Sequence, residues 1–307
     1  MNLIPKVLMI RPVNFYFNAE TALDNHFQQK ITITDAHNKA AFEFDRMVNM
    51  LRSEKIVVEV IQDTEEPATP DSIFPNNWIS FHQDNRICLY PMYAESRRLE
   101  RKPNIIKYLN ENYYISEIVD ISGCEKNNKF LEGTGSMILD RQNQIAYASL
   151  SERTNPELFN FWCTKFNYQG VCFSAFDKQQ LPIYHTNVLM CLGTSFVVIC
   201  LDTITNVNEK ELVLSYFAKT KKDVINISLE QMEKFAGNML QVFSTENWSY
   251  IVMSETAYLS LTTPQINQLK KHAKLLYPAI PTIETLGGGS VRCMMAELYN
   301  KPKTFIN

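Results

Sequence analysis

Three side chains of this sequence carry the groups needed to attack and protonate an electrophilic carbon. Cys293 offers a thiol just after Gly287–Gly289, which are three of the nine glycines in the chain. His185 and Glu132 each lie at the end of an apolar, strand-like run, where a scaffold presents functional side chains. Singly, such residues are more often a packed thiol, a helix cap or a surface group. Together they form the set required for nucleophilic catalysis.

Polar side chains that can bind a substrate lie beside the same strand-like runs. The segment DSIFPNN places Asp71, Asn76 and Asn77 ahead of one strand, and YHTN places Asn187 two residues after the histidine. A carboxylate only accepts hydrogen bonds, whereas an amide both donates and accepts them. These four side chains are therefore our substrate-binding candidates from the sequence alone.

The composition narrows the class of partner. Thirty basic and 33 acidic residues nearly balance, and no dense Lys/Arg run alternates with aromatic residues, so no nucleic-acid partner is expected. The N-terminal run MNLIPKVLMIRP is too short to span a bilayer and has no small-residue cleavage site, which predicts a cytoplasmic protein without a membrane partner. The seven cysteines include no CxxC pair, and HExxH is absent, so no metal is expected.

Alternating strands and helices must position these groups. Two strands, a helix and another strand recur every 50–60 residues or so, roughly five times, which fits a closed ring of similar modules. An ordinary doubly wound α/β domain is the alternative. We expect one domain over residues 1–307, with strands and helices as follows. Strands are predicted at KVLMI, KIVVEVI, WISFH, RICLY, SMILD, QIAYA, VLMCL, SFVVICL, DVINI, NMLQVF and SYIVMS, and helices over 38–52, 97–111, 155–166, 209–218, 229–233 and 263–275.

Six segments, taken in order, resemble the motifs of the pentein superfamily of guanidine-modifying enzymes. This superfamily includes arginine deiminase, dimethylarginine dimethylaminohydrolase and the amidinotransferases. The matching segments are DSIFPNN, SRRLE (96–100), FLEGTGSMIL, SLSERTNPE, YHTN and GGGSVRCM, spread over nearly the whole chain. The resemblance implies an α/β propeller of five ββαβ modules, the pentein fold, with the site in its central channel.

The resemblance also implies a mechanism without a metal or an organic cofactor. The Cys293 thiolate attacks a guanidino or ureido carbon, His185 protonates the departing amine and later activates water, and Glu132 orients the substrate or the imidazole. Arg97 and Arg153 match positions that grip the substrate's α-carboxylate in relatives, a task for a planar fork of donors. Surface ion pairs are the simpler role for arginines of this kind. Independently, the MMAEL run after Cys293 predicts a helix whose N-terminal amides favour the thiolate.

Two departures from the family motifs bear on the substrate. Relatives that act on a cationic guanidinium carry a carboxylate at the position of Asn77, and arginine deiminases carry another at that of Asn187. Two amides in place of two carboxylates favour a neutral ureido group, so citrulline is the expected substrate. A loop shift that brings Asp63 or Asp84 into the pocket would weaken this expectation.

Several functions stay open at this point. A cysteine hydrolase acting on citrulline is the main hypothesis; an amidinotransferase, a dimethylarginine hydrolase and an arginine deiminase are alternatives. A non-catalytic pentein that only binds its partner is a further alternative, although it would need neither Cys293 nor His185. The expected partner is a small amino-acid substrate, and a homodimer is left open.

Overall fold

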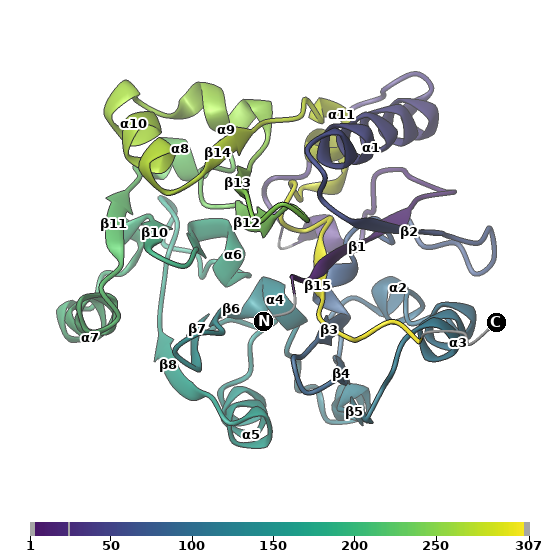
Figure 1. Ribbon diagram of the computed structural model, residues 1–307, viewed down its shortest axis with the longest axis horizontal. Coiled ribbons are helices and arrows are strands. Elements are labelled where there is room, and N and C mark those ends of the chain that lie inside the picture. The colour runs from purple at the N-terminus through teal and green to yellow at the C-terminus, as the bar shows by residue number, and fades with distance from the viewer. Residues whose placement is uncertain (1–3, 24, 304–307) are drawn as a thin grey trace.

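The computed structural model describes residues 4–23 and 25–303, where five three-stranded sheets surround the middle of the molecule (Figure 1). In each sheet, the middle strand pairs antiparallel with one neighbour and parallel with the other. The predicted α/β propeller of five ββαβ modules is therefore confirmed. By sheet, the strands are β3 (Ile79–Phe81), β4 (Arg86–Leu89) and β5 (Glu117–Asp120); β6 (Ile138–Asp140), β7 (Ile145–Ser149) and β8 (Gln169–Phe173); β9 (Met190–Leu192), β10 (Phe196–Ile199) and β11 (Asp223–Asn226); β12 (Leu240–Phe243), β13 (Ser249–Val252) and β14 (Lys274–Leu276); and β15 (Ala296–Leu298), β1 (Lys6–Arg11) and β2 (Val58–Gln62).

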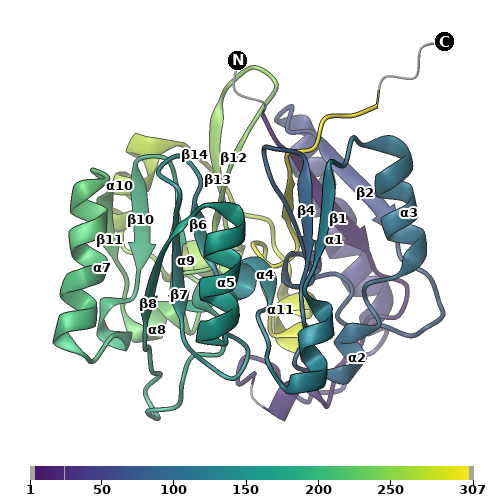
Figure 2. The ribbon, with the colours of Figure 1, turned by 90° about the horizontal axis from the view of Figure 1, so that it is seen from below.

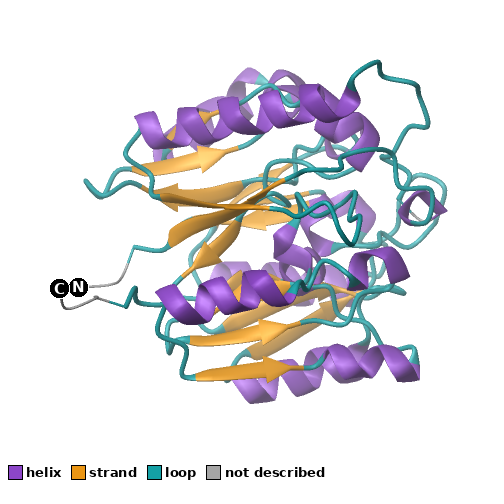
Figure 3. Ribbon diagram, turned by 90° about the vertical axis from the view of Figure 1, so that its right-hand side faces the viewer, coloured by secondary structure: helices purple, strands orange, loops and turns teal. Residues whose placement is uncertain are grey.

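The longer helices lie outside the sheets, where they connect the middle strand of a module to its parallel neighbour (Figures 1 and 3). Asparagine caps begin two of them, since Asn155 and Asn206 each accept two backbone N–H groups. The helices are α1 (Ala36–Ser53), α2 (Glu95–Arg98), α3 (Pro103–Asn112), α4 (Gly133–Ser136), α5 (Pro156–Phe166), α6 (Thr186–Leu189), α7 (Val207–Lys219), α8 (Leu229–Met232), α9 (Glu255–Ser260), α10 (Thr263–His272) and α11 (Pro281–Gly287). Among residues 4–23 and 25–303, none is long and apolar enough to cross a membrane.

The inner strands of the five sheets, β3, β6, β9, β12 and β15, surround the centre and contact one another at β15–β3, β6–β9 and β9–β12. Each inner strand runs antiparallel to the middle strand of its sheet. It comes first along the chain in four of the sheets, whereas β15 comes last in the fifth. The middle strands are the most buried; all four residues of β10 are enclosed. Because the inner strands share one orientation, the segments before them gather at one end of the centre, and those after them gather at the other end.

The fifth sheet joins the two ends of the described chain. Strand β15 pairs antiparallel with β1, which pairs parallel with β2, so the C-terminal strand completes a sheet begun near the N-terminus. Figure 2 shows the side view, with β1 and β2 beside the last strand's path. Residues 1–3, at the start of the N-terminal apolar run, lie outside the described residues.

The sequence-based helices are corrected at three places. The predicted helix 97–111 is two helices, because Pro103 excludes a helical conformation at Lys102. The predicted helix 263–275 ends at His272, since Lys274–Leu276 joins β13 as a parallel strand. The helix predicted after Cys293 is wrong: residues 296–298 form β15, so the thiol has no helix N-terminus beside it.

Candidate active site

The candidate residues gather at the end of the centre where the inner strands begin. Asn77 precedes β3, Glu132 precedes β6 through the short helix α4, and Asn187 lies in α6 just before β9. Asn238 precedes β12, and Cys293 precedes β15. Each of the five modules thus contributes one polar side chain from the same structural position.

His185 and Glu132 form a buried hydrogen-bonded pair. His185 Nε2 lies 2.7 Å from Glu132 Oε2, and both side chains are almost fully enclosed. Burial favours the neutral acid, but Arg153 and the bond from His185 outweigh it and hold the pKa of Glu132 below its usual range. An ionised carboxylate can only accept, so Nε2 carries the hydrogen and Nδ1 is the nitrogen that exchanges a proton.

The imidazole itself is poised in its neutral form. Burial is the main cause that lowers the pKa of His185, and Glu132 offsets it only in part. Its ring also lies against Gly135, where a Cβ would stand 2.9 Å from Nδ1 and 2.3 Å from Asn77 Nδ2. Only glycine at position 135 lets the imidazole and this amide approach each other so closely.

Amide groups surround the thiol of Cys293. Its Sγ accepts from Asn187 Nδ2 at 3.4 Å and from Asn238 Nδ2 at 3.3 Å, and the residue is buried. Asn238 Oδ1 accepts the backbone N–H of Arg292 at 3.0 Å, which fixes the orientation of the Asn238 amide. Two side-chain N–H donors therefore point at this sulfur, where sequence reasoning expected the amides of a helix N-terminus.

Arg97 is held by neighbouring groups of the protein. Its Nε and Nη2 donate to the two oxygens of Glu100 at 2.8 and 3.0 Å, and Nη1 donates to Asn77 Oδ1 at 2.8 Å. Nη2 also donates to the Phe74 carbonyl at 3.2 Å. Burial opposes a charge here, but Glu100 outweighs burial and raises the pKa of Arg97. Four of the five N–H interactions of this guanidinium are thus made within the protein.

Arg153 contacts Glu132 at the other side of the site. Its Nη1 lies 3.4 Å from Glu132 Oε2, and Nη2 donates to the Thr21 carbonyl at 3.5 Å. The guanidinium also lies over the rings of Tyr93 and Tyr184, at 5.8 and 5.0 Å from their centroids. Arg98, which follows Arg97 in the sequence, is partly exposed and pairs with Glu95 and Glu125, as expected for a surface ion pair.

Asp71 lines the same cavity with one carboxylate oxygen still open. Its Oδ2 accepts from Asn18 Nδ2 at 2.7 Å and Thr21 Oγ1 at 3.2 Å, whereas buried Oδ1 has no partner among the described residues. Burial outweighs the nearby Arg97 and raises the pKa of Asp71. A buried carboxylate oxygen without a donor is suited to an incoming N–H or ammonium group.

The two other aspartates considered from the sequence lie elsewhere. Asp63 accepts from Lys102 Nζ at 2.7 Å in a buried ion pair, and Asp84 pairs with Arg86. Asn76 is fully buried, but the cavity beside Cys293 is lined by Asn77, not by Asn76. The amide of Asn76 has no partner among residues 4–23 and 25–303.

A segment near the N-terminus covers this cavity. Asn25 Nδ2 and Gln28 Nε2 donate to the carbonyls of Gly288 and Gly287 at 3.3 and 3.2 Å. Gly288 ends α11 with φ 62°, and a Cβ there would lie 2.5 Å from Gln28, so the glycine permits both the turn and the cover. The cavity holds only about 20 Å³, room for a water molecule, so an amino acid needs the cover to move.

Sequence reasoning missed the covering segment and Asn238. The rule that identified Asn77 and Asn187, a polar residue just ahead of an apolar strand, applies equally to Asn238 at the start of NMLQVF. No pattern in the sequence points to Asn18, Thr21 or Asn25, which reach the site only through the closing of the fifth sheet. Within the described part of the chain, no group of three His, Cys, Asp or Glu side chains is placed to hold a metal ion.

Solved structures with the same fold are enzymes that act on arginine or a related amino acid. ArgZ, described as an arginine dihydrolase from the ornithine-ammonia cycle in Cyanobacteria, matches with a TM-score of 0.77 and 14% identity over 98% of this chain, which spans 41% of ArgZ. The N-terminal domain of ArgZ, a Cys-to-Ser mutant bound to substrate, matches with a TM-score of 0.75 and 14% identity over 96% of this chain and 99% of that domain. The DDAH of Pseudomonas aeruginosa, as a Cys-to-Ser mutant complexed with citrulline, matches with a TM-score of 0.68 and 13% identity over 96% of this chain and all of that one.

Sequence comparison supplies the family. A search against curated proteins found no match. The family model described as "N,N dimethylarginine dimethylhydrolase, eukaryotic" matches residues 11–300, which include all the candidate residues above. Because that match covers nearly the whole chain, this protein belongs to the N,N dimethylarginine dimethylhydrolase family of the pentein superfamily, the cysteine-dependent hydrolases that cleave a C–N bond of a guanidino-type group.

Proposed function

We propose that this enzyme hydrolyses a C–N bond at the ureido carbon of citrulline, through a covalent intermediate on Cys293. The observation that carries the proposal is the set of amides around the thiol. Asn187 and Asn238 both point Nδ2 at Sγ, and no carboxylate among the described residues makes a hydrogen bond to it. A site for a neutral group needs such amides, because they offer both donors and acceptors.

The unpartnered amide atoms match a ureido group in particular. Buried Asn77 Nδ2 and Asn187 Oδ1 have no partner among residues 4–23 and 25–303, which leaves one donor and one acceptor available. Asn77 cannot reverse these roles, because its Oδ1 accepts from Arg97. A urea presents one oxygen and several N–H groups, whereas a guanidinium presents only N–H groups, so an open N–H donor suits the urea better.

In the proposed first half-reaction, Cys293 Sγ attacks the ureido carbon as a thiolate. The proton lost by the thiol passes through His185 to the departing amine, which leaves neutral when the C–N bond breaks. A thiocarbamate remains on Cys293. His185 and Cys293 line the same cavity, and Glu132 keeps the imidazole oriented with Nδ1 as the exchanging nitrogen.

In the second half-reaction, His185 takes a proton from a water molecule that attacks the thiocarbamate carbon. The C–S bond breaks, the thiolate returns, and the released carbamic acid decomposes to carbon dioxide and an amine. Whichever nitrogen leaves first, one citrulline and one water give ornithine, ammonia and carbon dioxide. The balance needs no cofactor and no further reactant.

The substrate's amino-acid end is assigned to the charged groups of the cavity. We propose that Arg153 binds the α-carboxylate and that Asp71 Oδ1 accepts from the α-ammonium group. Arg97 is assigned a smaller share, since Glu100 and Asn77 occupy most of its N–H groups. Asn77 and Asn187 contact the ureido group. Asn76, enclosed beside the site, supports the loop that carries Asn77.

A second candidate, hydrolysis of a methylated arginine or of arginine itself, is favoured by a different observation. The matching family is described by its action on dimethylarginine, and Asp71 keeps one carboxylate oxygen open in the cavity. A transferase would share the first half-reaction with either hydrolase. It would require a second amine to replace water in the second half-reaction.

Measuring kcat/KM for citrulline, arginine and dimethylarginine, with ornithine, citrulline and ammonia as products, tests the proposal. We expect citrulline to give ornithine and one ammonia, at a kcat/KM at least about tenfold above either arginine compound. The double change Asn77→Asp and Asn187→Asp should shift the ratio toward the guanidinium substrates. A parent enzyme that prefers arginine or dimethylarginine by tenfold would overturn the citrulline assignment and leave the cysteine mechanism in place.

A further inference from the structure

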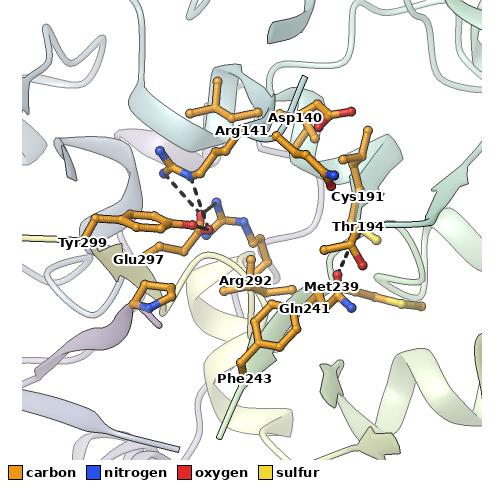
Figure 4. Close-up of a pocket in the computed structure, with 17 residues that line it drawn as sticks. Asp140, Arg141, Cys191, Thr194, Met239, Gln241, Phe243, Arg292, Glu297 and Tyr299 are labelled. Atoms are coloured by element: carbon orange, nitrogen blue, oxygen red, sulfur yellow. Dashed lines mark hydrogen bonds and ion pairs between the residues drawn. The ribbon is translucent and has the colours of Figure 1, made fainter. Parts of the chain in front are cut away.

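A second cavity lies at the opposite end of the same inner strands. Residues of β6, β9, β12 and β15 line it, together with Arg141, Thr194 and Tyr299, which follow β6, β9 and β15. Arg292, which precedes β15, also lines it, and its volume is about 120 Å³ (Figure 4). A cavity of that size holds several water molecules or a small polyatomic guest. Arg141, Arg292, Glu297 and Tyr299 form one side of it, and Thr194 and Gln241 lie across from them (Figure 4).

Two guanidinium groups share a single carboxylate in this cavity. Arg141 Nη2 and Arg292 Nη2 each lie 3.5 Å from Glu297 Oε2, and Arg141 Nε lies 3.4 Å from Oε1. The side chains of Arg141 and Arg292 are only 10% and 6% exposed. The pair Arg97–Glu100, with one carboxylate for one guanidinium, has contacts of 2.8 and 3.0 Å. Two arginines therefore share one carboxylate, and their contacts with it are longer than those of the Arg97–Glu100 pair.

The other charged groups nearby do not restore the balance. Asp140 is already paired with Lys222 at 3.0 Å, and both side chains are buried. Tyr299 donates to Glu297 Oε1 at 3.0 Å, and burial together with Glu297 raises the pKa of the phenol, so it stays neutral. Three positive and two negative charges therefore leave an excess of one positive charge in an enclosed space. Buried charges without a counter-charge are costly, which favours a negative guest.

The donors of Arg141 are only partly used within the protein, whereas Arg292 Nη1 donates to the Met295 carbonyl at 2.7 Å. Arg141 Nε is buried and makes no hydrogen bond to another described residue, and Arg141 Nη1 reaches the Phe81 carbonyl only at 3.3 Å. Burial is the main cause that lowers the pKa of Arg292, and Arg141 adds to the effect. A guanidinium in such surroundings gains from an oxyanion, because its planar fork matches two oxygens at once.

We propose that this cavity is a binding site for a small oxyanion, such as a carboxylate, bicarbonate or phosphate, held between Arg141 and Arg292. The site is separate from the thiol cavity, because the residues that line the two cavities do not overlap. It touches the other end through the backbone, since Arg292 N–H bonds Asn238 Oδ1, whose Nδ2 contacts Cys293 Sγ. The inference does not depend on which substrate the enzyme hydrolyses.

Anion-dependent thermal stability of the whole protein tests the site. Tm would be measured against phosphate, bicarbonate and acetate, each titrated at constant ionic strength with sodium chloride. A guest that binds only the folded state stabilises it in proportion to ln(1 + [L]/Kd), so for at least one oxyanion we expect a rise of about 5 °C whose concentration dependence fits a single Kd. The oxyanion with the lowest apparent Kd distinguishes among carboxylate, bicarbonate and phosphate as the guest.

Three variants establish whether a rise in Tm comes from binding in this cavity. Arg141→Gln should abolish this rise, and Glu297→Gln, which removes the competing carboxylate, should lower the apparent Kd about tenfold. Arg11→Gln breaks a two-pronged contact with Asp45 far from the cavity and should leave the rise unchanged. Because the Glu297 variant is expected to bind more tightly, loss of folding in the Arg141 variant does not decide the outcome. The proposal is overturned if no oxyanion raises Tm above the chloride control at equal ionic strength, or if Glu297→Gln weakens the binding or leaves it unchanged.

Discussion

The two ends of the propeller centre are built from the same five inner strands, yet their chemistry is opposite. The end before the strands gathers amides, a thiol, two arginines that each face their own glutamate, and Asp71 with one oxygen open, around a cavity of about 20 Å³. The end after the strands gathers two arginines over one glutamate, around a cavity of about 120 Å³. One end is charge-matched and nearly filled, and the other carries excess charge and open space.

This difference shows how a symmetric scaffold separates two tasks. The short strands hold both ends rigidly, so each end can have its own electrostatics without a change of fold. Matched charge around the thiol leaves the reaction to the nucleophile and its acid–base partner. Unmatched charge at the other end favours a bound anion. Variants placed at equivalent positions on the two ends can therefore test the assignment of each.

The largest expected effect comes from replacing Cys293, and a cysteine at the other end provides the control. Cys293→Ser should lower kcat by at least about 10³-fold, because the hydroxyl is a far weaker nucleophile, with Tm changed by no more than a few degrees. Cys191→Ser, in the arginine cavity, is the matched control and should leave kcat nearly unchanged. Steady-state kinetics and thermal unfolding of both proteins decide the matter. Retention of activity within tenfold in the Cys293 variant would show that this thiol is not the nucleophile.

His185→Ala should lower kcat by roughly 10²–10⁴-fold, because the departing amine then lacks a proton donor. A substrate whose leaving group is a thiol needs no proton on departure, so in the variant its adduct formation should be slowed less than the reaction of the amine-releasing substrate. Some loss is expected with both, because the Cys293 thiol also loses its proton acceptor. Intact-mass spectrometry of the adduct checks this. An equal loss with both substrates would assign His185 a structural role.

Replacing Arg153 and replacing Arg97, both beside the thiol cavity, should have effects of different kinds. Arg153→Gln should cost about 2 kcal/mol, roughly thirtyfold in kcat/KM, for a substrate with an α-carboxylate and almost nothing for the decarboxylated analogue. Arg97→Gln should instead lower stability by about 3–5 kcal/mol, because it leaves Glu100 buried without its partner. Chemical denaturation and paired kinetics separate the two outcomes. A loss for the Arg153 variant that is independent of the carboxylate would place this residue with the scaffold.

Asn238→Ala should slow both turnover and alkylation of Cys293 by iodoacetamide about fivefold, the effect of one hydrogen bond worth about 1 kcal/mol. Asn238→Asp should slow alkylation further, since a carboxylate repels the thiolate. The control is Asn143→Ala, which removes a side-chain hydrogen bond to Asp140 at the other end. Peptide mapping of the alkylated protein gives the rates. An Asp variant that reacts as fast as the parent would exclude this contact.

The smallest expected effect is a dependence of stability on pH. Each end holds a buried histidine, and burial lowers the pKa of both His82 and His185. Their unfolded forms therefore bind more protons below a pH of about 6.5, so stability falls as the pH drops through that value, by up to about 1.4 kcal/mol per pH unit for each. Glu132 opposes the shift of His185 only, so His82, stacked on Phe166, should dominate.

Replacing His82 measures its contribution to the pH dependence of stability directly. In His82→Phe, the free energy of unfolding should decline less between pH 7 and pH 5 than in the parent, as followed by urea titration at each pH. Because burial raises the pKa of Glu100 to about 7, that carboxyl adds stability on acidification and opposes the histidines, so the difference between the variant and the parent decides the assignment. A variant whose free energy of unfolding declines as steeply as that of the parent would contradict the assignment of His82 as a neutral buried group.

The strands that sequence patterns predicted are mostly those near the centre. Their apolar runs reflect burial on both faces, as in β10, where all four residues are enclosed. The strands that were missed include β5, β8 and β14 at the outer edges, where the pattern is more polar; only one of the four residues of β5 is buried. Strand β15 was missed because its short run, AEL, has the composition of a helix.

For the site, the sequence located the functional side chains just before the inner strands but could not identify their hydrogen-bond partners. Cys293, His185, Glu132, Asn77 and Asn187 lie together because each precedes or begins an inner strand, a position visible in the sequence. The link from Asn238 to Cys293 joins residues far apart in the chain, and only the propeller geometry brings them to 3.3 Å. The same is true of the cover, in which Asn25 reaches Gly288.

The sheet β15–β1–β2 gives the enzyme a built-in order of assembly during synthesis. Strands β1 and β2 leave the ribosome before β15, which begins three residues after Cys293 and follows the other four modules along the chain. The thiol can be anchored among its amides only after that last strand pairs with the first. A nascent or prematurely terminated chain therefore carries the other four modules without a placed nucleophile, and reactivity appears only when the ring has closed.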